Sequence, residues 1–136
     1  PATAMYPISV GGFRPETETV SPFSGRGDQD CAGRVLLDLA APAEAVRSAK
    51  PGGGYDVYTG TSMAAPFVSG AAALMMEWGI VQGNDLFLYN QRVKAFLCKG
   101  ALRSPFLSYP NPQWGYGRLN LCGTMRELVD HLERGL

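Results

Sequence analysis

The chain has 136 residues, 46% of them hydrophobic and 18% charged, and its twelve basic residues balance its twelve acidic ones. This length suits one domain, and the apolar content excludes an intrinsically disordered chain. The neutral balance, without a long basic run, argues against electrostatic binding to nucleic acid or to an anionic membrane, so we expect neither partner.

The first half of the chain is predicted to form short strands separated by turns. Residues 6–10 predict a strand that ends at the two glycines that follow, and residues 34–40 predict a buried strand that Pro42 ends. Residues 44–49 and 55–59 lie on either side of a Gly-rich turn, which predicts a β-hairpin.

Two helices are expected next. Residues 62–78 predict a helix that is apolar on nearly all sides, which is typical of a buried helix. Polar residues and a proline interrupt this stretch before it reaches the roughly 18 apolar residues that a membrane-spanning helix needs. A second helix is predicted over residues 85–99, with Asn84 or Asp85 as its N-terminal cap and Gly100 as its stop.

The C-terminal third is predicted to hold a loop, a strand and a helix. A Pro- and aromatic-rich loop over residues 102–117 precedes a short strand over residues 118–122, and Thr124 and Glu127 form a capping box for a final helix. Strands and helices alternate along the chain, so the predicted fold class is α/β, with residues 1–136 as a single unit.

The cysteines and the start of the chain bear on its origin. Cys31, Cys98 and Cys122 cannot all pair within one chain and lack the spacing of metal ligands, so we expect reduced thiols, which favour a reducing compartment. The chain begins at Pro1 with neither an initiator Met nor an apolar leader. We therefore expect a processed product or a piece of a longer protein.

One segment carries the strongest chemical signal: residues 60–70 read GTSMAAPFVSG. A serine that opens a helix can present its Oγ as a nucleophile, while its own N–H faces a developing oxyanion. A serine at a helix start is, however, more often an ordinary cap, and on this feature alone the cap is the better interpretation. Pro66 is expected near the first turn of the helix, where its missing N–H costs little.

The full string decides between these interpretations. It resembles the serine-nucleophile signature of the subtilases, the subtilisin-like serine peptidases, G-T-S-M-A-x-P-x-V-x-G, at every fixed position. Residues 37–42 (LDLAAP) resemble the family's LDVxAPG turn, with Ala43 in place of the usual Gly, and residues 116–121 (YGRLNL) resemble its GxGxxN closing strand. Residues 83–114 most resemble subtilases of the clostridial spore-germination type.

This resemblance implies a fold and a set of roles. The fold would be the C-terminal part of a subtilisin-like three-layer α/β/α sandwich with a mostly parallel sheet. Ser62 matches the nucleophile, and its N–H matches one oxyanion donor; the Thr61 hydroxyl supports the oxyanion, and Met63 lies beside the leaving-group side. The parent protein would be secreted or spore-associated.

The resemblance also implies a weak cation site and no cofactor needed for the reaction. The carbonyl groups of Ala2, Ala4 and Pro7, with the carboxylate of Asp38 nearby, match positions that bind calcium or a monovalent cation in some members. The plain alternative is an ordinary strand and turn at these positions.

The family's catalytic order is Asp, then His, then Ser, and here the one histidine, His131, follows Ser62. It is expected to be a partly exposed helical residue, with the catalytic Asp and His and an oxyanion Asn supplied by a segment before Pro1. Without a base a serine hydroxyl is a poor nucleophile, so we expect negligible peptidase activity from the chain alone.

Two functions are therefore carried forward. In the first, the parent is a serine endopeptidase that cleaves peptide or protein substrates through an acyl-enzyme on Ser62. In the alternative, the chain is part of a pseudoprotease that serves as a regulatory or binding module. A domain divided through its sheet exposes strand edges and apolar faces, which would favour a homodimer of the piece.

Overall fold

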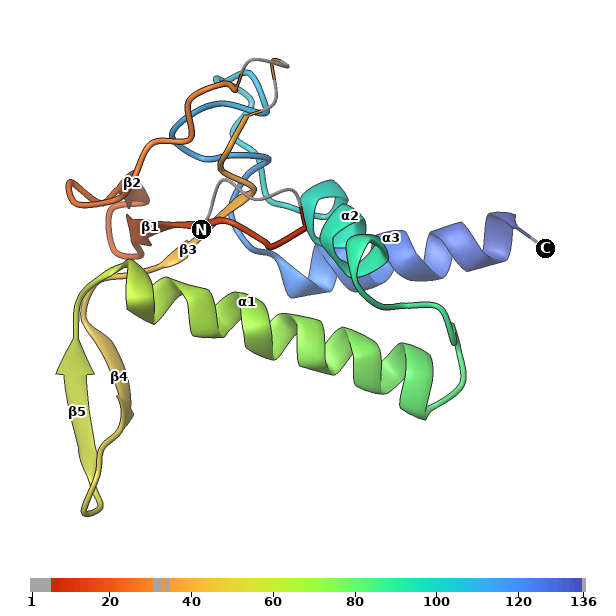
Figure 1. Ribbon diagram of the computed structural model, residues 1–136, viewed down its shortest axis with the longest axis horizontal. Helices are drawn as coiled ribbons and strands as arrows, with labels where there is room; N and C mark the ends of the chain where they lie inside the picture. Colours follow the sequence, from red (N-terminus) through yellow and green to blue (C-terminus); the bar gives the residue numbers. More distant parts are fainter. Residues whose placement is uncertain (1–5, 31–32, 34, 136) are drawn as a thin grey trace.

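A computed structural model describes residues 6–30, 33 and 35–135 of the chain, and Figure 1 shows the order of its elements. The strands are β1 (Val10–Arg14), β2 (Thr19–Val20), β3 (Leu39–Pro42), β4 (Val46–Ala49) and β5 (Tyr55–Tyr58). The helices are α1 (Thr61–Met76), the π-helical η1 (Glu77–Val81), α2 (Gln91–Lys99) and α3 (Leu121–Arg134).

The central strand β1 pairs with β3 in parallel and with β2 antiparallel. The prediction that the first strand ends at its two glycines is wrong, because both glycines lie inside β1. A Cβ atom on Gly12 would lie 2.5 Å from Cβ of Ala43, so glycine is needed there for close packing and does not end the strand. The predicted second strand is shifted as well: β3 starts at Leu39 and runs into Pro42.

The predicted hairpin is confirmed. Strands β4 and β5 pair antiparallel, with Val46 opposite Tyr58 and Ala49 opposite Tyr55. The hairpin projects away from the β1–β3 pair, and β5 is exposed along its whole length.

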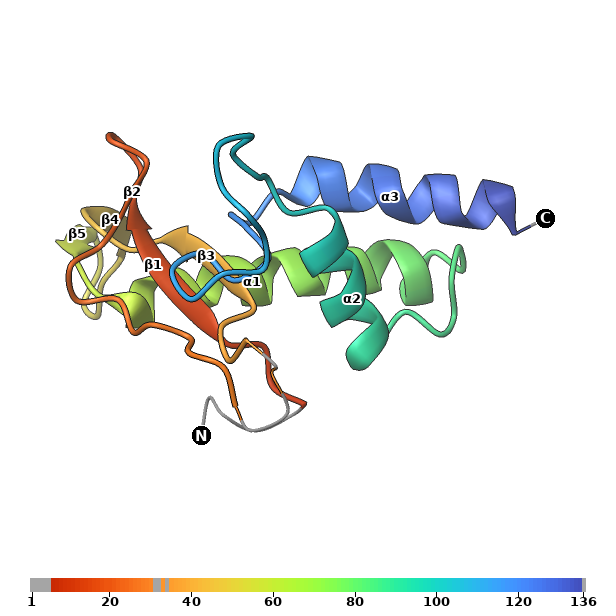
Figure 2. The same cartoon turned by 90° about the horizontal axis from the view of Figure 1, so that it is seen from above.

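Helix α1 covers one side of β1 and β3 (Figure 2). The buried side of α1 presents Ala64, Val68, Ala71 and Met75, which are spaced by three or four residues and so share one face of the helix. The opposite face of this apolar helix is exposed, so the chain covers α1 on one side and not on nearly all sides as predicted.

The predicted second helix begins six residues later than expected, at Gln91. Asp85 accepts a hydrogen bond from the N–H of Phe87 (3.1 Å) and pairs with Arg92 (2.9 Å), so it fixes the loop before α2. Gly79 allows this loop to fold back, because a Cβ there would lie 2.7 Å from the side chain of Leu88, which is fully buried.

Helix α3 starts at Leu121, where a strand was predicted. The cap is Asn120, whose side chain accepts a hydrogen bond from the N–H of Gly123 (3.1 Å), and the expected capping box is absent. Thr124 is fully buried, and its hydroxyl donates to the Asn120 carbonyl (3.0 Å). The core joins the sheet to helices α1, α2 and α3 through fully buried side chains, among them Leu39, Met75, Leu88, Leu97 and Leu128.

Candidate active site

The serine-bearing segment lies where β5 leads into α1. Gly60 precedes the helix with φ 154° and ψ 159°, a backbone conformation that residues other than glycine rarely adopt. Thr61 is the first helical residue and Ser62 the second, so the serine is not the cap that its position in the sequence indicated. The Ser62 side chain is exposed, and none of the residues that the structure describes makes a hydrogen bond to its hydroxyl.

The start of α1 provides a positive electrostatic environment for this serine. The first N–H groups of a helix lack intrahelical acceptors, and the helix dipole places partial positive charge there. The N–H of Ser62 belongs to this group. Pro66 is the sixth helical residue, later than the first turn where it was expected, and it removes the N–H that would otherwise donate to the Ser62 carbonyl.

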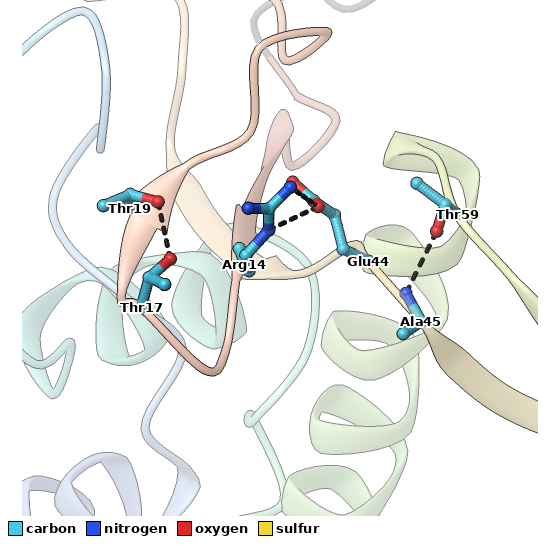
Figure 3. Close-up of polar contacts among 6 residues, drawn as sticks. All are labelled: Arg14, Thr17, Thr19, Glu44, Ala45 and Thr59. Carbon is cyan, nitrogen blue, oxygen red and sulfur yellow. Dashed lines mark hydrogen bonds and ion pairs between the residues drawn. The ribbon is translucent and has the colours of Figure 1, made fainter.

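Hydrogen bonds from both sides hold this helix start in place. The N–H of Gly60 donates to the carbonyl of Ala43 (2.8 Å), whose own N–H donates to the carbonyl of Phe13 in β1 (3.0 Å). Next to this contact, the hydroxyl of Thr59 accepts from the N–H of Ala45 (3.0 Å; Figure 3). The segment that leads into Ser62 is therefore held against β1 through the turn that follows β3.

A charged pair closes the same turn, as Figure 3 shows. Arg14 contacts one carboxylate oxygen of Glu44 through both Nε (2.7 Å) and Nη2 (2.6 Å). The Ser21 side chain and then Arg14 hold the pKa of Glu44 below its ordinary value, against the opposing effect of burial.

The residues next to Ser62 differ in their surroundings. Thr61 is half-buried, with its methyl group toward β1, because a Cβ on Gly12 would lie 3.4 Å from Thr61 Cγ2. Thr61 also lines a cavity of about 270 Å³ beside the start of β1. Met63 is half-buried, while Ala64 is fully buried. The roles of Thr61 and Met63 toward a substrate stay predictions.

His131 lies far from the serine. It sits in the last turns of α3, and its ring packs edge-on against Phe96 of α2, with the ring centroids 5.4 Å apart. The start of α1 lies next to the hairpin, at the opposite end of the molecule from the C-terminal end of α3 (Figure 1). His131 therefore cannot serve Ser62 as a base within this chain.

The candidate cation ligands lie on another part of the molecule. Ala2 and Ala4 fall outside the described residues. Pro7 and Asp38 do come together, but between them lies the ammonium group of Lys94, 2.9 Å from the Pro7 carbonyl oxygen and 2.8 Å from Asp38 Oδ2. This contact of Lys94 has no signal in the sequence, because a lysine on an amphipathic helix is by default a solvated residue.

Of the cysteines, Cys98 is buried in α2 and Cys122 is exposed, and both are free thiols. Burial, followed by the nearby Asp38 carboxylate, raises the pKa of Cys98 to about 12. Such a thiol stays protonated at neutral pH and is a poor nucleophile. Cys31 lies outside the described residues.

Comparison with known proteins defines the class of molecule to which this site belongs. Residues 1–117 match the model of the subtilase family, and the chain therefore belongs to that family of serine peptidases. Among curated relatives, subtilisin E of Bacillus subtilis is 43% identical over 76 residues, which are 54% of this chain and 18% of the relative.

Solved structures extend the likeness to nearly the whole chain. The structure of the Clostridium perfringens CspB protease matches 96% of this chain with 46% identity and a TM-score of 0.91. The prenylagaramide maturation protease PagA matches 94% with 29% identity and a TM-score of 0.75. These comparisons confirm the subtilisin-like fold. The chain spans 28% of the CspB chain and 44% of the PagA chain, so it corresponds to part of the subtilase fold.

The segment Thr61–Val81 could cross a membrane by length and composition alone, with a mean hydropathy of 1.4 and 28% of its most apolar stretch buried. The polar residues and the proline that interrupt this stretch are the reason that no membrane-spanning helix was expected from the sequence. A core helix of a water-soluble protein passes the same test.

Proposed function

We propose that Ser62 is the nucleophile of a subtilisin-like serine endopeptidase. The observation that carries this proposal is the exposed hydroxyl on the second residue of α1, at the positive end of the helix, within a family-signature segment. Membership of the subtilase family makes peptides or proteins the expected substrates.

In the proposed reaction Ser62 Oγ attacks the carbonyl carbon of the scissile peptide bond. A histidine takes the hydroxyl proton, and an aspartate orients that histidine. We expect both from a part of the full protein outside this chain, and His131 does not supply the base because it lies near the C-terminal end of α3 and packs against Phe96. The carbon–nitrogen bond then breaks, the histidine delivers the proton to the leaving amine, and water hydrolyses the acyl-serine.

The N–H of Ser62 supplies one donor to the oxyanion that forms during this attack, and a side-chain amide from outside the chain supplies the other. Thr61 supports the same oxyanion. Without the histidine the serine is not activated, so we expect negligible peptide hydrolysis from the 136-residue chain alone.

The test is active-site labelling of the full-length protein with a fluorophosphonate probe, followed by peptide mapping. We expect the label on Ser62 and its loss in Ser62→Ala. The matched control is Ser69→Ala, since Ser69 is also exposed on α1 but its hydroxyl donates to the Ala65 carbonyl (3.3 Å). This control should keep full labelling.

Folded full-length protein that takes up no label would contradict the enzyme and favour the pseudoprotease alternative. Turnover by the purified chain alone, abolished by Ser62→Ala, would contradict the proposed need for an outside histidine.

A homodimer of the chain is a separate proposal. It is supported by the exposed apolar residues of α1, such as Phe67 and Leu74, and sedimentation of the chain would test it.

A further inference from the structure

The start of the β1–β3 pair contains an internal positive charge. Lys94, on α2, donates from its ammonium to the Pro7 carbonyl (2.9 Å) and to Asp38 Oδ2 (2.8 Å). The side chains of the ion pair are 17% and 10% exposed, so the pair is largely withdrawn from water. The N–H of Ser9 donates to the same oxygen of Asp38 (2.8 Å).

This arrangement does not fit a metal ion. A calcium ion needs six to eight oxygen ligands at about 2.3–2.6 Å, and two of the expected ligands, the Pro7 carbonyl and Asp38 Oδ2, already accept from Lys94. Asp38 Oδ2 accepts two hydrogen bonds, which uses its lone pairs. Among the described residues no group of three His, Cys, Asp or Glu side chains could hold a metal ion.

Charge repulsion also disfavours a metal ion at this position. A cation that contacts both the Pro7 carbonyl and Asp38 would lie within a few ångströms of the Lys94 ammonium. At about 4 Å in a partly buried site, like charges repel strongly enough to lower affinity by about a thousandfold.

We propose that the Lys94 ammonium serves as a built-in structural cation, so that this part of the fold needs no calcium or monovalent ion. Gln91, three residues earlier and therefore on the same face of α2, donates to the Tyr6 carbonyl (3.1 Å). Helix α2 thus holds two successive carbonyl groups of the chain that leads into β1, and Lys94 supplies the charge that balances Asp38.

The proposal is independent of the catalytic proposal and is tested by stability. Full-length protein is melted in calcium, sodium or choline chloride at matched ionic strength, and again after treatment with a chelator. The variant is Lys94→Met, which keeps the length of the side chain and removes its charge. The control is Lys99→Met, because Lys99 lies on the same helix, half-exposed, and pairs with Glu127 (2.9 Å) away from Asp38.

We expect the melting temperature of Lys94→Met to fall by several degrees, with part of the loss restored by calcium or sodium and not by choline. The melting temperatures of the parent and of Lys99→Met should show no difference between the cations that Asp38→Asn abolishes. Lys94→Arg keeps the charge and should stay independent of the cation, which covers the case in which Lys94→Met does not fold.

Two results would overturn the proposal. One is a Lys94→Met protein that melts like the parent. The other is a parent protein whose melting temperature falls on chelation, with Asp38→Asn abolishing that fall, since this would place a metal at Asp38 in the presence of Lys94. A metal dependence of the parent that persists in Asp38→Asn reports another site and agrees with the proposal.

Discussion

The close contact between Gly12 and Ala43 gives the most direct test of how the active-site segment is positioned. In Gly12→Ala the new Cβ would lie 2.5 Å from Cβ of Ala43, whereas carbon atoms in contact normally lie about 3.5–4.0 Å apart. Neither segment can move away freely, because the N–H of Ala43 donates to the carbonyl of Phe13, the residue next to Gly12. We therefore expect an overpacking cost of about 1–3 kcal/mol.

A compensating substitution separates this clash from a general effect on the strand. Ala43→Gly alone removes a fully buried methyl group and should cost about 1 kcal/mol. Combined with Gly12→Ala it moves one methyl group from one side of the contact to the other. The two changes should therefore couple by about 1–3 kcal/mol, with the double variant more stable than Gly12→Ala.

Urea unfolding of the parent, the two single variants and the double variant measures the coupling free energy between the two substitutions. Gly25→Ala is the control, because a Cβ there meets nothing within 4 Å, and it should change stability by no more than about 0.5 kcal/mol. Labelling of Ser62 should fall in Gly12→Ala and recover in the double variant, because Ala43 also accepts the hydrogen bond from Gly60. Additive free energies in the cycle would refute the contact as the cause.

Three further predictions concern single groups. Asn120→Ala removes the cap of α3 and should lower the free energy of unfolding by about 1 kcal/mol in urea titrations. An unchanged free energy of unfolding would show that the cap does not stabilise α3. At pH 8 iodoacetamide should modify Cys122 much faster than Cys98, whose pKa is raised to about 12; equal rates in peptide maps would contradict this burial. Because the folded pKa of Cys98 is raised, its contribution to stability should be lost as the pH rises from about 9 to about 12. Because the folded pKa of Glu44 is lowered, its contribution is present above the unfolded value of 4.5 and lost as the pH falls below it. Arg14→Met should therefore flatten the acid branch of a stability–pH profile, and an unchanged profile would count against the pair.

The features that the sequence predicted correctly depend on local patterns. The Gly-rich turn between two β-like runs is sufficient to indicate the hairpin, because turn chemistry and strand propensity act within a few residues. The string over residues 60–70 likewise contains the glycine, the serine and the helix that together place Ser62. A local motif of this kind is recognisable without any knowledge of its surroundings.

The features that the sequence did not predict depend on distant partners. The glycines of β1 predict a stop from their local pattern, whereas Gly12 is needed for close packing against Ala43, which is far along the chain. Lys94 reads locally as a solvated helix residue, whereas its partners, the Pro7 carbonyl and Asp38, lie far away in the sequence. Each residue has a good local interpretation that long-range packing overrides.

Helix α1 carries Ser62 and has an uncovered apolar face. It is apolar on both faces, but in this chain only the face toward β1 and β3 is covered, and Phe67 and Leu74 on its other side are 42% and 57% exposed. Burial of such side chains contributes about 1.5–3 kcal/mol each, so a partner surface on that face would be held strongly. In the proposed enzyme, the segment that brings the histidine to Ser62 must reach the first turn of this same helix. We therefore expect covering of α1 and completion of the catalytic site to occur together. Leu74→Ser, about three turns from Ser62, should then lower labelling of the serine in the full-length protein. Undiminished labelling of Leu74→Ser would separate the two events.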